Sequence, residues 1–125
     1  MISVMIVDDN DEIRRMLRDV LAGLADPIYE CHDGGEAGAA YGTHRPDWVL
    51  MDVSMEPVDG LAATRHIIQA FPDARVVMVT QHADVSLRNA ALEAGACGYL
   101  LKDNLLDVRR FLESQSAARS TDDDA

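Results

Sequence analysis

Charged and hydroxyl-bearing residues follow or end four short apolar runs of this sequence, and their types suit a metal-dependent reaction. They are Asp8 and Asp9 after ISVMIV, Asp52 after DWVLM, Thr80 at the end of ARVVMVT, and Lys102 after GYLL. Two carboxylates about 4 Å apart repel each other by about 4 kcal/mol at an effective dielectric constant of about 20. A hard divalent cation such as Mg²⁺ takes oxygen ligands and offsets that repulsion, and the lysine adds a second positive charge. We therefore predict a divalent metal site where the fold brings these residues together.

The hydrophobic pattern predicts the elements that would bring them together. Apolar runs predict strands at 2–7, 28–32, 47–51, 74–80 and 98–101. Helices are expected from a stripe between Ile13 and Leu24, over about 34–43 behind a cap at Asp33, over about 60–71, from a cap at Asp84 to Gly95, and from a cap at Asn104 onward. Because parallel strands need crossover connections, five such βα units imply one doubly wound α/β domain with a parallel five-stranded sheet. Ligands of such folds bind beyond the carboxyl ends of the strands, where the polar residues stand.

The charge balance and the composition exclude several classes of protein. The net charge is −11, so the domain repels phosphate backbones and direct binding of nucleic acid is not expected. No run approaches the roughly 20 apolar residues of a membrane span, and the first residues lack the basic segment of a signal peptide. Cys31 and Cys97 stand far apart without a metal-binding spacing, which is typical of core cysteines in a reducing compartment. We therefore expect a cytoplasmic protein that does not contact a membrane. It would have one domain over 1–116, followed by a flexible acidic tail or the start of a linker over 117–125.

The residues around Asp52 suit phosphoryl transfer better than other reactions. No histidine neighbours a serine or cysteine in a motif spacing, and no glycine-rich loop follows the first strand, so acyl transfer and nucleotide binding have no support. An acidic metal site with a hydroxyl and an amine favours formation of an aspartyl phosphate. The metal and Lys102 would neutralise the phosphoryl oxygens in transit, and Thr80 would donate a hydrogen bond to one of them.

Four segments of the sequence resemble, in order and spacing, the receiver domain of bacterial two-component response regulators over residues 1 to about 116. They are VDDNDEIRRML, WVLMDVSM…VDGLAATR, VVMVT and EAGACGYLLKD. The resemblance implies that Asp52 accepts a phosphoryl group from a sensor histidine kinase. It further implies that Asp9, Asp52 and the backbone carbonyl of Ser54 ligate Mg²⁺ or Mn²⁺, with Asp8 helping through water. The flavodoxin-like strand order 2-1-3-4-5 is expected from the same analogy.

The resemblance also assigns a conformational switch. Thr80 matches the switch hydroxyl, Tyr99 the rotating aromatic residue, and Lys102 the phosphate-binding lysine. A phosphoryl group adds roughly −1.5 to −2 charge and three acceptor oxygens, so Thr80 and Lys102 are drawn to it and Tyr99 turns inward. The face formed by the helix that begins at Asp84, the strand 98–101 and the last helix then changes for an output domain or partner protein. GYLLKD is frequent in receivers joined to helix-turn-helix DNA-binding domains, so control of transcription is expected. A phosphorylation-linked homodimer is compatible with the family, but nothing in the residues selects it.

Four positions depart from the family pattern or vary within it. Gln81 stands where most receivers have a small residue beside the pocket, and we predict that it slows phosphorylation by small donors. Ser54 and His82 occupy the two variable positions that tune phosphoryl lifetime in this family. His82 is either an exposed loop histidine or a contact of the phosphoryl group or of a water molecule. Glu56 takes the place of a proline, with Pro57 one residue later. Its carboxylate either faces solvent, which we favour, or ligates the metal ion directly or through water.

Two other functions compete with a phosphorylatable receiver. A degenerate receiver, acting as a phosphorylation-independent protein-interaction module, is supported by Gln81 and Glu56, but the intact acidic set argues against it. A Mg²⁺-dependent phosphatase with an aspartate nucleophile would need a second acid two residues after Asp52, where Ser54 stands. We therefore expect a signalling domain that catalyses only its own phosphorylation and dephosphorylation, and not an enzyme with turnover substrates.

Overall fold

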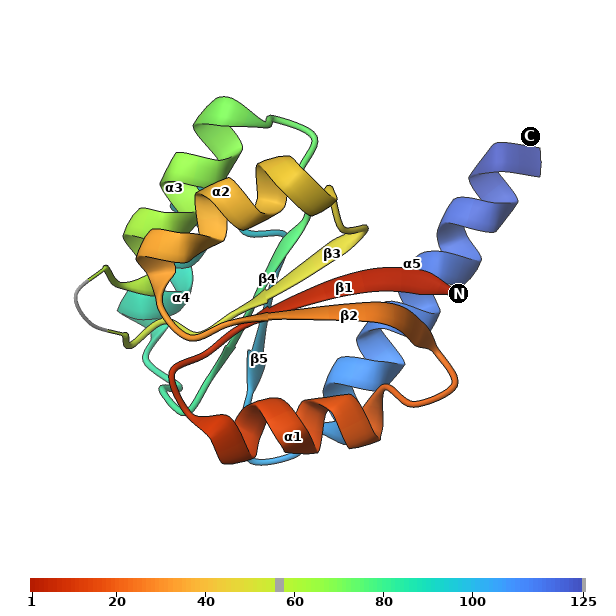
Figure 1. The fold of residues 1–125 in the computed structure, drawn as a ribbon, viewed down its shortest axis with the longest axis horizontal. Coiled ribbons are helices and arrows are strands. Elements are labelled where there is room, and N and C mark those ends of the chain that lie inside the picture. Colours follow the sequence, from red (N-terminus) through yellow and green to blue (C-terminus); the bar gives the residue numbers. More distant parts are fainter. Residues whose placement is uncertain (56–57, 125) are drawn as a thin grey trace.

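A parallel five-stranded sheet with a helix after each strand forms the fold. The computed structural model describes the backbone of residues 1–55 and 58–124, and the side chains of these residues up to 115. Its elements are β1 (Ile2–Val7), α1 (Asp11–Val20), β2 (Ala25–Cys31), α2 (Gly34–His44), β3 (Trp48–Met51), α3 (Gly60–Ala70), β4 (Val76–Thr80), α4 (Val85–Ala94), β5 (Gly98–Leu101) and α5 (Leu106–Asp124). The strand order is β2-β1-β3-β4-β5 (Figure 1). The predicted fold class and strand order are confirmed.

The helices cover both faces of the sheet. α2, α3 and α4 lie on one face, and α1 and α5 lie on the other (Figure 1). Neighbouring residues of a central strand point into opposite layers. Met5 and Met51 lie in the cluster on the α2 side, whereas Ile6 and Leu50 lie in the cluster on the α1 side. Every residue of β3 and β4 is buried, because helices exclude water from both faces, and this explains the nearly unbroken apolar runs of these strands.

The register brings the carboxyl ends of the central strands to one edge of the sheet. Val7 at the end of β1 pairs with Cys31 of β2 and with Met51 of β3. Thr80 at the end of β4 pairs with Leu101 of β5. The polar residues that end or follow these strands therefore share one edge, as predicted. The strand order reverses between β1 and β3, and such a switch point is where α/β sheets bind ligands.

The two largest differences from the predicted boundaries, of three residues or more, both lie near the turn between α1 and β2. α1 ends at Val20, although the apolar stripe continues to Leu24. Gly23 adopts a left-handed conformation with φ of 82°, while Leu24 still packs in the layer on the α1 side. The stripe therefore marks burial beyond the end of the helix. β2 begins three residues earlier than predicted because Ala25 pairs with Ile2 at the start of β1.

Capping residues begin and end the helices as the sequence indicates, with one exception. Asp33 Oδ1 accepts a hydrogen bond from an amide of α2 at 3.0 Å, and Asn104 Oδ1 accepts one from the first amide of α5 at 3.1 Å. Gly95 follows α4 with a left-handed φ of 113°, which glycine adopts without strain. Asp84 precedes α4 with an extended backbone, but its side chain accepts no hydrogen bond from that helix.

The last helix is the longest element. α5 spans 19 residues. Across the described part of the chain, no helix combines the length and the apolar character needed to cross a membrane. The assignment of 1–116 as the domain and of 117–125 as a tail or linker remains a prediction.

Candidate functional site

Three carboxylates converge at the carboxyl edge of the sheet. Asp8 and Asp9 follow β1, and Asp52 follows the neighbouring strand β3. Each offers one oxygen, and these oxygens all lie within 4.8 Å of one another. Asp8 and Asp52 are 3% and 5% exposed, whereas Asp9 is exposed. The predicted convergence is confirmed, and the three residues form what we call the acidic pocket.

Lys102 reaches the acidic pocket from β5. Its Nζ lies 2.9 Å from Asp8 Oδ2 and 3.3 Å from Asp52 Oδ1. The Lys102 amide donates to the Thr80 carbonyl at 2.8 Å, which fixes the base of the side chain beside β4. Lys102 is the one lysine among the 125 residues. The fold thus places the chain's only ammonium side chain between two buried carboxylates.

The charges of the pocket favour a bound cation. Burial raises the pKa of Asp52, the charge of Asp8 raises it further, and Lys102 opposes both effects. Burial alone would lower the pKa of Lys102, but hydrogen bonds and attraction from Asp8 and Asp52 raise it above its usual value. Lys102 is therefore protonated at neutral pH. By formal charge, three carboxylates and one ammonium group sum to −2, which one divalent cation balances. Carboxylate oxygens are hard ligands, so the donor set fits Mg²⁺ or Mn²⁺.

Thr80 and Tyr99 hold the loop between β4 and α4 from two sides. The Thr80 hydroxyl, which is fully buried, accepts a hydrogen bond from the His82 amide at 3.2 Å. The Tyr99 hydroxyl donates to the His82 carbonyl at 2.6 Å. Burial raises the pKa of Tyr99, and the charge of Asp84 adds to this shift, so the hydroxyl remains a donor. The two residues that the resemblance assigns to the switch therefore both contact the backbone of one loop residue.

Ser54 and His82 form a contact across the mouth of the pocket that the sequence analysis missed. Ser54 Oγ lies 3.0 Å from His82 Nε2, and the Ser54 amide donates to Asp52 Oδ1 at 3.4 Å. His82 is half-buried. The sequence spacing could have predicted this contact. Ser54 stands two positions after Asp52 and His82 two positions after Thr80, and these predicted site residues end or follow the neighbouring strands β3 and β4. Loops that follow neighbouring parallel strands lie side by side, so the side chains at the two variable positions contact each other.

The structure does not test the predictions for Gln81 and Glu56. Gln81 is exposed at the start of the β4–α4 loop, and its effect on small donors remains a prediction. Glu56 and Pro57 lie outside the described residues, so the alternatives for the Glu56 carboxylate remain open.

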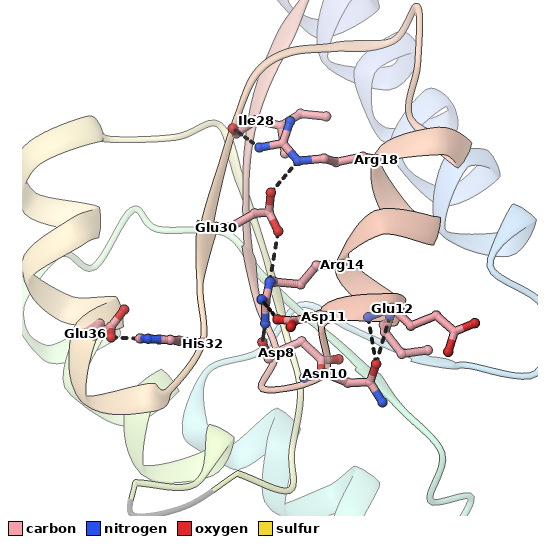
Figure 2. Close-up of polar contacts among 11 residues, drawn as sticks. Asp8, Asn10, Asp11, Glu12, Arg14, Arg18, Ile28, Glu30, His32 and Glu36 are labelled. Carbon is pink, nitrogen blue, oxygen red and sulfur yellow. Dashed lines mark hydrogen bonds and ion pairs between the residues drawn. The ribbon is translucent and has the colours of Figure 1, made fainter.

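A second group of ligand-type side chains lies at the start of α2. His32, Asp33 and Glu36 also bring donor atoms within 4.8 Å of one another. These donors already have partners: His32 Nδ1 lies 2.9 Å from Glu36 Oε1 (Figure 2), and Asp33 caps α2. All three side chains are exposed or half-buried. This group therefore differs from the acidic pocket, where burial makes uncompensated charge costly.

Comparison with known sequences identifies related proteins along most of the chain. The family described as the response regulator receiver domain matches residues 4–112. The transcriptional regulatory protein DegU of Brevibacillus brevis is 37% identical over 117 residues, covering 90% of this chain and 48% of that protein. The response regulator GacA of Pseudomonas viridiflava is 40% identical over 106 residues, covering 82% of this chain and 49% of that protein. The chain spans about half the length of these curated relatives.

Solved structures agree with the sequence matches. A LuxR-family two-component response regulator from Aurantimonas sp. SI85-9A1 superimposes with a TM-score of 0.84 at 32% identity, covering 94% of this chain and 86% of that one. A chain of the CheX–CheY–BeF3–Mg complex from Borrelia burgdorferi gives a TM-score of 0.83 at 26% identity, covering 90% and 87%. Because the family match runs from β1 into α5, the chain belongs to the family of response regulator receiver domains.

Proposed function

We propose that Asp52 accepts a phosphoryl group from the phosphohistidine of a sensor histidine kinase, with Mg²⁺ or Mn²⁺ bound in the acidic pocket. The observation that carries this proposal is the buried Asp52 carboxylate beside Asp8 and Lys102, in a pocket whose residual charge matches one divalent cation. An Asp52 oxygen attacks the phosphorus, the phosphorus–nitrogen bond of the phosphohistidine breaks, and the imidazole nitrogen leaves with the electron pair. The product is an aspartyl phosphate.

The chain's own residues prepare the carboxylate and hold the product. Lys102 and the Ser54 amide both contact Oδ1 of Asp52, at 3.3 and 3.4 Å, which leaves Oδ2 to attack. Asp9, Asp52 and the backbone carbonyl of Ser54 would ligate the cation, with Asp8 acting through water. When bound, the cation neutralises charge on the phosphoryl oxygens, and Lys102 neutralises a further oxygen.

Thr80 and Tyr99 transmit phosphorylation to the surface in this proposal. When the Thr80 hydroxyl turns to a phosphoryl oxygen, it gives up its bond to the His82 amide. The β4–α4 loop is then freed on one side, and Tyr99, which holds the same loop through the His82 carbonyl, moves with it. The face of α4, β5 and α5 changes as a result and engages an output domain or partner protein. Relatives named as transcriptional regulators support control of transcription as the output.

Mass spectrometry of the intact protein after incubation with acetyl phosphate and Mg²⁺ tests the phosphoacceptor. We expect one phosphoryl adduct on the wild-type chain and none on Asp52→Asn. Beryllofluoride with Mg²⁺ should likewise bind the wild type and not the variant. A wild-type chain that takes no adduct from small donors or from a histidine kinase would overturn the proposal and favour the phosphorylation-independent interaction module.

A further inference from the structure

The peptide that joins Asp8 to Asp9 is held at its carbonyl by a side chain from α1. The last rung between β1 and β2 is the hydrogen bond from the Asp8 amide to the Cys31 carbonyl, at 3.1 Å. Beyond that rung the strand has ended, and the Asp8 carbonyl accepts from Arg14 Nη1 at 2.5 Å. Asp8 is 3% exposed, and a buried carbonyl without a hydrogen-bond donor is unfavourable. Arg14 therefore satisfies a group that the sheet leaves unpaired.

Arg14 is itself fixed by acidic partners on two elements. Its Nε donates to Glu30 Oε1 of β2 at 2.9 Å, and its Nη2 pairs with Asp11. The side chain is 13% exposed. Glu30 also binds Arg18, and Figure 2 shows the Arg14 guanidinium between Glu30 and the loop that carries Asp8. The guanidinium thus connects the loop after β1, which carries Asp8 and Asp9, to β2. Its planar group of N–H donors can form several directed hydrogen bonds at once.

We propose that Arg14 is a positioning residue of the acidic pocket: its bond to the Asp8 carbonyl sets the orientation of the Asp8–Asp9 peptide and so aims both carboxylates toward Asp52. Without this donor the carbonyl turns toward water, because a buried unpaired carbonyl is unfavourable. Rotation of that peptide moves the backbone of Asp9, and the spacing of the three carboxylate oxygens is lost. The inference rests on the proposed function for the identity of the cation.

The sign of the effect separates positioning from electrostatics. Arg14 is a cation beside a pocket proposed to bind a divalent cation, so removal of its charge alone would tighten Mg²⁺ binding. Loss of the hydrogen bond from Arg14 to the Asp8 carbonyl instead predicts weaker Mg²⁺ binding. Groups that orient metal ligands typically contribute 10–100-fold to metal affinity. Arg18 is a matched control in the same chain. It also binds Glu30, but it donates to the Ile28 carbonyl and not to the Asp8 carbonyl.

Titration calorimetry with Mg²⁺ on the full chain tests the inference. We expect Arg14→Met to weaken Mg²⁺ binding about tenfold or more, and Arg18→Met to change it by less than about twofold. Arg14→Lys keeps the charge but lacks the planar fork that joins Glu30 to the Asp8 carbonyl, so its affinity should also fall below that of the wild type.

Amide hydrogen exchange without metal gives a second readout. The Asn10 amide donates to Asp8 Oδ1 at 2.9 Å, and its exchange should accelerate in Arg14→Met and stay unchanged in Arg18→Met. Wild-type or tighter Mg²⁺ binding by folded Arg14→Met overturns the inference. If urea unfolding shows that this variant does not fold, Arg14→Lys decides, and wild-type affinity with unchanged Asn10 exchange overturns it. A wild-type chain that binds no Mg²⁺ refutes the proposed function instead, and Asn10 exchange then still tests the role of Arg14.

Discussion

Replacing Lys102 with methionine should destabilise the metal-free protein by about 3–5 kcal/mol at neutral pH. The ammonium nitrogen lies 2.9 Å from Asp8 Oδ2 and 3.3 Å from Asp52 Oδ1, and the three side chains are 14%, 4% and 6% exposed. At an effective dielectric constant of about 20, the two attractions amount to about 6 and about 5 kcal/mol. Desolvation of the ammonium offsets much of this gain in the wild type, so the net loss is smaller than the attractions themselves.

The loss should depend on pH with a defined sign. Burial and the charge of Asp8 already raise the pKa of Asp52, and removal of the ammonium raises it further. A carboxyl group whose pKa is higher in the folded state takes up a proton on folding, so its destabilising effect is present at neutral pH and fades as the pH falls. The difference in unfolding free energy between wild type and Lys102→Met should therefore shrink as the pH falls below neutral. The raised pKa of Lys102 affects stability only in strong alkali. The stabilisation that the Lys102 ammonium provides to the folded state is lost only as the pH rises above the usual value of 10.5.

Urea unfolding followed by tryptophan fluorescence measures these free energies. Trp48 is the one tryptophan and is 3% exposed. Arg110→Met removes a cation from an exposed ion pair with Asp107, so it is a control of equal charge change, with an expected effect within about 0.5 kcal/mol. A loss for Lys102→Met no larger than that of the control would refute the reasoning. So would a difference from the wild type that does not shrink in acid.

Three further predictions concern residues that follow β3 and β4 in the sequence. Ser54→Ala and His82→Ala should shift the phosphoryl lifetime in the same direction, and the double variant should show little beyond either single change, because the two side chains contact each other at 3.0 Å. Additive effects on the decay of labelled protein would contradict this pairing. Gln81→Ala should speed labelling by acetyl phosphate, because the larger side chain narrows access for small donors, and equal labelling rates would show that it does not. Glu56→Ala should leave the Mg²⁺ affinity unchanged, as expected for a solvent-facing carboxylate, whereas weaker binding in the calorimeter would identify Glu56 as a ligand.

The sequence alone locates the candidate site residues because they stand where strands end. Asp52 and Lys102 follow apolar runs directly, and a parallel sheet brings all such ends to one edge. The turn after α1 shows the limit of the same pattern. Leu21 and Leu24 continue the apolar stripe and pack in the layer on the α1 side, yet the helix ends at Val20. Hydrophobic periodicity reports which side chains are buried, whereas the backbone hydrogen bonds that define a helix depend on local conformations such as that of Gly23.

The contacts that hold the backbone around the candidate site are harder to predict, and Arg14 shows why. Nothing in its own neighbourhood of the sequence distinguishes it from Arg15, the next residue on the same amphipathic helix. Its role depends on three facts of tertiary structure: β1 ends at Val7, the Asp8 carbonyl lies beyond the last rung, and Glu30 of β2 holds the guanidinium from the other side. Each of these facts concerns a backbone group or a neighbouring strand. The residue type at position 14 does not determine any of them. Chemistry at a sheet edge can therefore be located from the ends of strands. The contact of Arg14 with the Asp8 carbonyl instead depends on which peptide group the sheet leaves unpaired, and that is decided only by the tertiary structure.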